Sequence, residues 1–432
     1  MNGNANGLGD GLSRRNFFKA AVAIGGTNAL SACLERESVD VPEGGGELPD
    51  RQHAWNDYLR ADDHGNVLTP YHHALLLLDY TGDASDTEDD RATVEDAFSS
   101  LERAYEWSHE GLVFTVGYSP YYFDRFDETP GVELPEPEPM AAFENPDLDT
   151  ADAVVHLTSD HASVVLEAEE ALLGERERAN GVEIDADLTS VFEKVERRTG
   201  FVGEGLPAEH QDVGGVPENK PVPDDSPLYM GFKSGFEESQ ATEDDVTLGD
   251  EAGAFAGGTT QHVSHLHLNL EQWYGQDSRY QRVAKMFCPV HAEEERVEGV
   301  GENLGAASGT EDCPEPMESA RGDTATVGHA QKARSAREDG RPPLLRRDFD
   351  STDPGPFDSA KRGRAGIHFV ALQDDIEKFV RVREAMNADE VVSESTVGPK
   401  HNNGILQYII TRSRGNYLVP PRSLRALPPA SP

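Results

Sequence analysis

The chain has 432 residues, and its 38 lysines and arginines are outnumbered by 80 aspartates and glutamates, which gives a formal net charge of −42. A surface of that sign repels nucleic acid, so the composition excludes a nucleic-acid-binding role. Hydrophobic residues make up 37% of the chain and gather in patterned segments, which argues against a largely disordered acidic protein. The acidic surface instead indicates a halophilic protein, because strong brine screens the repulsion between carboxylates.

The N-terminus has the features of an exported lipoprotein. Residues 13–19 (SRRNFFK) form a twin-arginine signal, and the apolar run at 20–30 is too short to span a bilayer as a mature helix. Residues 30–33 (LSAC) resemble a lipobox, which predicts lipidation of Cys33 and a position on the outer face of the cell membrane. The alternative is an exported protein with an incidental cysteine in its leader. No later segment has an apolar run of membrane length, so we expect membrane contact only through Cys33.

Shifts in composition divide the chain into six parts. We expect a signal and lipobox at 1–33, a flexible Gly/Pro/acid-rich tether at 34–70, an N-terminal module at 71–201, a linker at 202–228, a C-terminal module at 229–421 and a tail at 422–432. The body is long for one core, so two packed modules fit its length.

Hydrophobic periodicity predicts alternating strands and helices in the N-terminal module. In chain order they are a strand at 73–80, a helix at 93–107, strands at 112–117 and 153–158, a helix at 161–173 and a strand within 188–198. This order is β-α-β followed by β-α-β.

The C-terminal module repeats the alternation. We expect a strand at 262–270, a helix at 272–286, a long acidic Gly-rich loop at 289–325, a strand at 366–372, a helix at 374–386 and a strand at 405–410. Two such halves with antiparallel sheets predict an α+β fold built from duplicated ferredoxin-like modules, of the dimeric α+β barrel type.

Apart from Cys33, the chain has two cysteines, Cys288 and Cys313. In an exported protein a disulfide between them closes a loop of about 25 residues and contributes about 3 kcal/mol of stability. A metal-thiolate site is the alternative, but the pair lacks a CxxC spacing. The sequence therefore favours the disulfide.

Three short segments combine residues suited to binding a metal and a peroxide. They are GFKSG at 231–235, GHAQKAR at 328–334 and PLLRRDF at 343–349. They supply a turn framed by glycines, a histidine that can ligate a metal, and a pair of arginines. A neutral imidazole can hold a haem iron, and a fixed cation can polarise bound peroxide.

With five further segments, the chain resembles the dye-decolourising peroxidase family over most of 71–421. The segments are VGYSPYYFDRF at 116–126, AVVHLTSDHASVV at 153–165, GGTTQHVSHLHLNLEQW at 257–273, GIHFVALQDDIEKF at 366–379 and GNYLVPP at 415–421. The resemblance implies one haem b per chain, hydrogen peroxide as the oxidant and an unidentified donor oxidised in one-electron steps. Assembly into a homo-oligomer is left open.

The resemblance also implies roles for single residues. His329 is the expected ligand of the haem iron, and Asp375, with Asp374 adjacent to it, takes the family position that holds the other ring nitrogen, as metal-bound histidines require. The alternative for His329 is an ordinary surface histidine. Arg346 is expected to stabilise negative charge as the peroxide bond breaks, with a plain ion pair as its alternative. For Arg347 we expect an ion pair or a contact with a haem propionate.

The GFKSG segment resembles the GxxDG signature of the family, with Ser234 in the place of the acid. Phe232, Lys233 and Gly235 of this segment, together with Phe369, are expected to contact the haem. A serine hydroxyl can orient water or peroxide but has no suitable pKa for carrying a proton.

Ser234 leaves two functions open, and it leaves open what replaces the acid. Glu237, Glu238 or a chain of water molecules could do so. Function is either an exported haem peroxidase or a haem-binding or haem-handling protein of the same fold with little peroxidase activity. A surface scaffold without a cofactor is the third alternative.

His262, His265 and His267 lie close together on one predicted strand and could suggest a metal site. Catalytic metal sites usually take a further ligand from another element, so we expect these histidines to pack in the core or against the edge of the haem.

Overall fold

The structure is a computed structural model, and it describes residues 40–84, 87–126, 130–351, 353 and 365–430. The predicted signal, the lipobox and Cys33 lie outside the described residues and stay predictions. None of the described helices is both long and apolar enough to cross a membrane.

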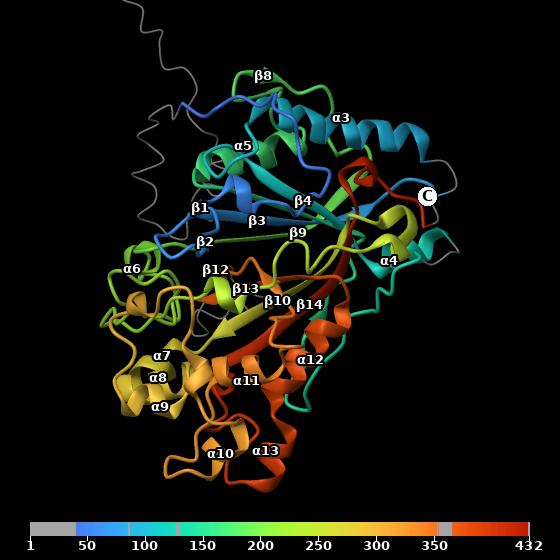
Figure 1. Cartoon of the computed structure of the whole chain (residues 1–432). Coiled ribbons are helices and arrows are strands. Elements are labelled where there is room, and N and C mark those ends of the chain that lie inside the picture. Colours follow the sequence, from blue (N-terminus) through green and yellow to red (C-terminus); the bar gives the residue numbers. More distant parts are fainter. Residues whose placement is uncertain (1–39, 85–86, 127–129, 352, 354–364, 431–432) are drawn as a thin grey trace, which may run out of the picture.

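The N-terminal module contains a four-stranded antiparallel sheet covered on one face by two helices (Figure 1). Its elements are β3 (His72–Tyr80), α3 (Glu88–Ala104), β4 (Val113–Tyr118), β6 (Ala153–Ser159), α5 (Ala162–Leu172) and β9 (Phe192–Phe201). The strands lie in the order β9-β3-β6-β4, which is the ferredoxin-like arrangement predicted from the sequence. β3 carries an uninterrupted leucine run because both of its faces are buried.

The C-terminal module repeats this topology. Its elements are β10 (Thr259–Leu268), β11 (Leu345–Arg346), β12 (Phe349–Ser351), β13 (Gly366–Gln373), α12 (Ile376–Asn387) and β14 (Ile409–Val419). β10 pairs with both β14 and β13, and β13 pairs with β11 and β12. The order β14-β10-β13-β12 matches that of the first module.

The two sheets join at both edges into a closed barrel. β12 pairs with β9, and β14 pairs with β4 through Leu418 and Tyr118. The interior contains apolar side chains such as Leu75, Val263 and Val370. It also holds four imidazoles, His73, His156, His265 and His368, whose pKa values burial lowers, so that they are neutral. The predicted α+β fold with duplicated modules is confirmed.

The connection between β10 and β11 contains five helices. They are α7 (Leu270–Gln276), α8 (Arg279–Met286), α9 (Pro289–Glu293), α10 (Pro316–Arg321) and α11 (His329–Ser335), and α13 (Asp389–Glu394) follows α12. Besides short 3-10 helices, the remaining described strands and α-helices are β1 (Arg60–Ala61), β2 (Val67–Leu68), α4 (Pro120–Phe123), β5 (Asp147–Leu148), β7 (Arg178–Ala179), β8 (Val182–Glu183) and α6 (Leu206–Glu209).

Three predicted elements of this module were wrong in detail. The single helix predicted at 272–286 is two helices, because Ser278 caps the second one by accepting from the backbone N–H of Gln281. The acidic segment 289–325 is not only loop, since α9 and α10 begin within it at prolines, which suit the first helical position. The last strand is β14 rather than 405–410; pairing on both sides buries its polar residues.

The segments predicted to be a tether, a linker and a tail are partly folded onto the modules. Trp55 is 2% exposed in the N-terminal core, so the described part of 34–70 is not simply a tether. In the linker Val213 and Val222 are buried, and beyond the second module Leu427 is buried against the first. Composition rich in Gly, Pro and acid resembles a flexible chain, but a few apolar side chains are enough to fix such a segment.

Candidate functional site

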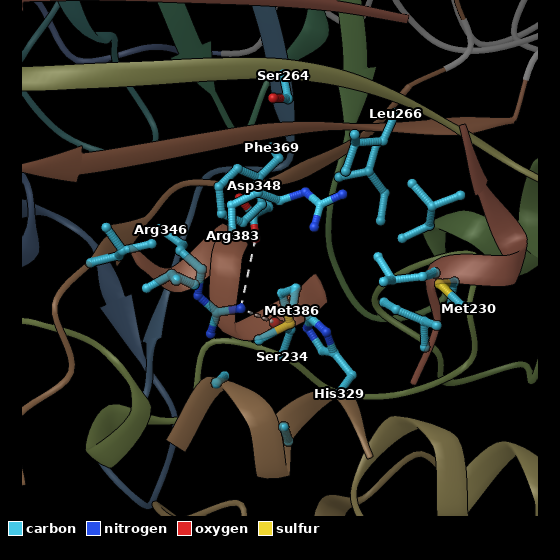
Figure 2. A pocket seen from close by; sticks show the side chains of 18 of the residues that line it. Met230, Ser234, Ser264, Leu266, His329, Arg346, Asp348, Phe369, Arg383 and Met386 are labelled. Atoms are coloured by element: carbon cyan, nitrogen blue, oxygen red, sulfur yellow. Dashed lines mark hydrogen bonds and ion pairs between the residues drawn. The ribbon is translucent and has the colours of Figure 1, made fainter. Parts of the chain in front are cut away.

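A cavity of about 650 Å³ lies on the outer face of the C-terminal sheet, between the sheet and helices α11 and α12 (Figure 2). Cofactor pockets commonly have roughly 300–1,000 Å³. Strand alternation explains which side chains reach it. Leu266 of β10 and Phe369 of β13 line the cavity, whereas their neighbours His265 and His368 are buried in the barrel interior.

The lining of the cavity is apolar and cationic. Apolar residues include Phe232, Leu266, Phe369, Phe379, Met386 and Leu406. Of the described residues that line it, eight are cationic, among them Arg334, Arg337, Arg346 and Lys400, and three are acidic: Glu144, Asp147 and Asp348. The net charge of the cavity lining is therefore positive, opposite in sign to the net charge of the whole chain. A ligand with an apolar body and negatively charged groups fits this lining.

His329 is the first residue of α11, and its imidazole points into the cavity (Figure 2). Glycine at position 328 lets the helix begin close to α8, because a Cβ there would lie 1.7 Å from the carbonyl oxygen of Phe287. Burial, with the nearby charges of Lys332 and Arg346, lowers the pKa of His329 to about 3. The ring is neutral, and no group of the described residues is hydrogen-bonded to its nitrogens, so it is free to ligate a metal.

Asp375 does not lie behind His329, and this prediction was wrong. Its carboxylate is exposed at the start of α12, where it accepts from the backbone N–H of Glu377 at 2.9 Å. A carboxylate is favoured there because the first N–H groups of a helix have no partner within it. The adjacent Asp374 pairs with Lys378 at 2.6 Å.

The buried charged residue of α11, one turn after His329, is a lysine rather than an acid. Lys332 donates to the carbonyl oxygen of Met386 at 2.7 Å and to Asn403 Oδ1 at 2.6 Å. Burial, with the charge of Arg383, lowers its pKa to about 7. In the part of the chain that the structure describes, no carboxylate is hydrogen-bonded to the imidazole of His329.

Arg346 and Ser234 lie together in the cavity, as Figure 2 shows. Arg346 Nη1 donates to Ser234 Oγ at 3.4 Å. Gln240 Oε1 accepts from the backbone N–H and from Nε of the same arginine. Ser234 is held in a turn between Gly231 and Gly235, whose φ angles of 81° and 75° favour glycine. The arrangement fixes the guanidinium charge beside a hydroxyl that can orient a small ligand.

Arg347 points to the opposite side from Arg346. Its Nη2 donates to Asn56 Oδ1 at 2.7 Å and lies 3.1 Å from Glu243 Oε1, while its guanidinium covers the ring of Trp55 at 5.4 Å. Burial lowers its pKa to about 10, against the opposing effect of Glu243. Arg347 is outside the cavity, so of its two predicted roles the ion pair is the one observed.

Asp348 is a cavity residue that the sequence reasoning missed. Its Oδ2 lies 3.9 Å from Arg346 Nη1, and its Oδ1 accepts from the backbone N–H of Val370 at 3.1 Å. Burial raises the pKa of Asp348 to about 6, although Arg346 opposes the rise. The signal was present in PLLRRDF, since residues 346 and 348 of an extended segment share a side and 347 takes the other.

The other predicted contacts divide into residues inside and outside the cavity. Phe232, Lys233 and Phe369 line it, and Lys233 also pairs with Asp62. Gly235 shapes the turn without lining the cavity.

Two further expectations concerned acids and histidines outside the motif residues. Glu237 and Glu238 are exposed beyond the turn and do not line the cavity. His262 stacks on Phe379 with ring centroids 3.5 Å apart, whereas His265 lies 3.3 Å from Ser351. These two histidines have separate partners and form no common metal site within the described residues.

A second missed group lies at the end of the cavity formed by residues 143–147. Glu144 pairs with Arg383 at 2.6 Å and with Arg414 at 2.9 Å. Burial alone would raise the pKa of Glu144, but the two arginines outweigh it and lower the pKa. No sequence signal connects these residues, because more than 230 positions separate them.

Cys288 and Cys313 form a disulfide beside the start of α11, with their Cα atoms 6.2 Å apart. His291 Nδ1 lies 3.2 Å from the sulfur of Cys288 and 3.5 Å from that of Cys313. Within the described residues these three are close enough to hold a metal. With both sulfurs in the disulfide, thiolate ligands are not available to one.

Comparisons with known proteins agree with this architecture. The model of the family of unknown function DUF7405 matches residues 70–421, and no curated protein matches the chain. A DyP-type peroxidase of Streptomyces coelicolor has a TM-score of 0.57 at 16% identity, covering 89% of this chain and 95% of that one. A dye-decolorizing peroxidase of Bacteroides thetaiotaomicron has 0.54 at 15% identity, covering 86% and 98%. A DypB variant of Rhodococcus jostii in complex with haem has 0.51 at 14% identity, covering 83% and 96%.

At such low identities these likenesses establish the fold, whereas the family match extends over most of the sequence. The chain therefore belongs to the DUF7405 family and has the fold of the dye-decolourising peroxidases.

Proposed function

We propose that this protein is a haem-dependent peroxidase that uses hydrogen peroxide to oxidise donors in one-electron steps. The observation that carries the proposal is that one cavity holds both a neutral imidazole, His329, with no hydrogen-bond partner among the described residues, and a fixed guanidinium, Arg346. Those two groups are the ones that binding an iron and polarising a peroxide require.

The residues of the cavity fit one haem b per chain. His329 would hold the iron, because its ring nitrogens have no partner among the described residues. The apolar side chains would cover the porphyrin, and cationic residues such as Arg334 and Arg337 on α11 would hold its carboxylates. Among the described residues no carboxylate is bonded to His329, and an imidazole without such a partner is a weaker electron donor than one that is paired with an acid.

The side chains around the cavity define what the protein contributes to the reaction. Bound haem supplies the iron that binds peroxide and the electrons that reduce it. Arg346 places a permanent positive charge where negative charge develops on the departing oxygen. Ser234 orients the peroxide through its hydroxyl, and the apolar lining excludes bulk water, which strengthens both effects.

The setting of the activity is also part of the proposal. The twin-arginine motif and the lipobox support export and attachment to the outer face of the cell membrane through Cys33. The net charge of −42 supports work at high salt, and we propose an electron donor that reacts at the protein surface.

The test is peroxide-dependent oxidation of a reporter dye by protein purified from a haem-replete host. We expect a Soret band, a haem content of about one per chain from the fit above, and turnover well above that of free haemin at equal concentration. Wild-type protein that carries haem but shows no more turnover than free haemin would contradict the proposal.

A second function, haem binding or haem handling with little peroxidase activity, is favoured by one observation. Ser234 stands where the resemblance places an acid, and a serine cannot carry a proton at neutral pH. The same assay separates the two functions, because haem binding without turnover is the result that this alternative predicts.

A further inference from the structure

One wall of the cavity carries three polar side chains in a row: Ser234, Arg346 and Asp348. Arg346 Nη1 is the central group, 3.4 Å from the serine hydroxyl and 3.9 Å from the carboxylate. The carboxylate has one oxygen held by the backbone N–H of Val370, which leaves the other oxygen on the side of the arginine. Its side chain is only 14% exposed, and Asp348 is one of the residues lining the cavity.

We propose that Asp348 is the proton-carrying catalytic residue of this site, in the place of the acid that Ser234 cannot supply. The inference rests on the proposed peroxidase function. It assigns to a residue two positions after Arg346 a role that the motif at 231–235 leaves unfilled. Glu237 and Glu238, the nearest acids to that motif in sequence, are exposed outside the cavity and cannot reach a bound peroxide.

The proton moves in two steps that leave Asp348 unchanged. The Asp348 carboxylate first accepts the proton from one oxygen of hydrogen peroxide. It then returns that proton to the other oxygen as the O–O bond breaks, and this oxygen leaves as water. Both oxygens end at the oxidation level of water, and the two electrons required come from the haem. Arg346 stabilises the negative charge that precedes the second transfer.

The surroundings of Asp348 suit this task. The charged and titratable groups on neighbouring elements are Arg346 beside it, Arg383 on α12 and the neutral His329 on α11 (Figure 2). A carboxyl with a pKa of about 6 is largely ionised at pH 7, so it can accept a proton, and it is acidic enough to return the proton. An ordinary surface aspartate has a lower pKa, so its carboxylate is a weaker base and a poorer acceptor of the peroxide proton.

The test compares haem-loaded wild type with Asp348→Asn, using Glu237→Gln as the matched carboxylate-to-amide control outside the cavity. We expect Asp348→Asn to keep its Soret band and to react with peroxide about 100-fold more slowly, the range typical of lost acid–base catalysis. Binding of cyanide to the ferric protein gives a second readout, since hydrogen cyanide must also lose its proton. Its rate should depend on an ionisation near pH 6 in wild type and in the control, but not in Asp348→Asn.

Two further variants keep the test decisive. In the Asp348→Asn background, Ser234→Asp should restore most of the lost rate, because it returns an acid to the other side of Arg346. If Asp348→Asn fails to bind haem, Asp348→Glu takes its place, and we expect that variant to keep the rate with a shifted ionisation. An unchanged peroxide rate and an unchanged cyanide profile in Asp348→Asn, or in Asp348→Glu an unchanged cyanide ionisation, would overturn the inference and leave the proposed function intact. Wild type without haem would instead contradict the proposed function itself.

Discussion

The two modules share one topology, yet one is filled and the other contains a cavity. In the N-terminal module the described part of the connection between the first two strands, 81–112, carries one α-helix, α3, which packs Val94, Phe98 and Leu101 onto its sheet. The matching connection of the C-terminal module, 269–344, carries α7 to α11 and ends beside the sheet with His329. The longer connection therefore supplies His329 and one side of the cavity, which the first module lacks.

The second helix of each module shows how the cavity is kept open. The buried residues of α5 include Ala168 and Ala171, which let the helix lie close to its sheet. At the matching place α12 presents Phe379, Arg383 and Met386 to the cavity. The small side chains of α5 allow it to pack closely on the first sheet. The large side chains of α12 hold this helix away from β10 and β13 in the second module.

Arg346, the last residue of β11, and Arg347, which follows it, give the largest expected difference between a cavity residue and a core residue. Haem-loaded Arg346→Leu should keep its Soret band and lose about 100- to 1,000-fold in the rate of reaction with peroxide, because it removes a fixed charge from the reacting oxygen. Stopped-flow absorption measures this rate directly. A rate within threefold of wild type would exclude Arg346 from the reaction.

Arg347→Leu is the matched control, because the same substitution is made on the other side of the strand. It should leave the peroxide rate of the folded protein nearly unchanged. It should lower the free energy of unfolding by about 1–3 kcal/mol, since Glu243 loses the charge of its partner but keeps the backbone N–H groups of Trp55 and Asn56. Loss of activity without loss of stability in this variant would mean that the two arginines have been assigned the wrong way round.

Leucines on the two sheets sharpen the comparison of packing. Leu76→Ala, in the filled core of the N-terminal module, should lower the free energy of unfolding by about 2–5 kcal/mol. Leu266→Ala should cost less than about 2 kcal/mol in haem-free protein, because that side chain already borders a cavity. Denaturant unfolding at one salt concentration measures both, and equal losses would contradict the contrast between the modules.

The disulfide fastens the long connection that only the C-terminal module has. Replacing both Cys288 and Cys313 with serine should lower the free energy of unfolding by about 3 kcal/mol under oxidising conditions. Under reducing conditions the same replacement should have little effect, because the wild-type bond is then open. Thermal unfolding with and without a dithiol reductant separates the two cases, and a loss that persists in the reductant would point to packing instead of the bond.

The effect of Asp348 on stability depends on pH. Its pKa rises from 3.8 to about 6 on folding, so between these values the folded chain holds a proton that the unfolded chain has released. The free energy of unfolding therefore falls as pH rises through this window, by about 3 kcal/mol at most. Asp348→Asn should be more stable than wild type at pH 8 and equal to it below pH 4. If the variant and wild type are equally stable at both pH values, burial does not raise the pKa of Asp348.

The sequence predicted the two sheets well because their signals are local. Apolar runs such as 73–80 and alternating segments such as 262–270 identify buried strands without knowledge of their partners. The residues of GFKSG and PLLRRDF were expected at a site because these short motifs resemble, in the same chain order, motifs of the dye-decolourising peroxidases.

The rest depended on packing between distant parts of the chain. The expected contact of Asp375 was wrong because two partners suit its carboxylate: the backbone N–H groups at the start of a helix and the imidazole of His329. Only the structure decides between them. The ion pairs of Glu144 with Arg383 and Arg414 join segments far apart in sequence. Trp55 belongs to a segment whose composition suggests flexibility, and its burial depends on a core formed by later residues.

The most direct test of the account is a haem titration of haem-free wild type, His329→Ala and the exposed control His401→Ala, followed by the Soret band. We expect wild type and His401→Ala to bind one haem per chain and to give matching spectra. His329→Ala should bind at least about 100-fold more weakly, since loss even of an outer partner costs about 10- to 100-fold in metal affinity. Equal affinity and an equal spectrum for His329→Ala would contradict the central claim that this imidazole holds the iron.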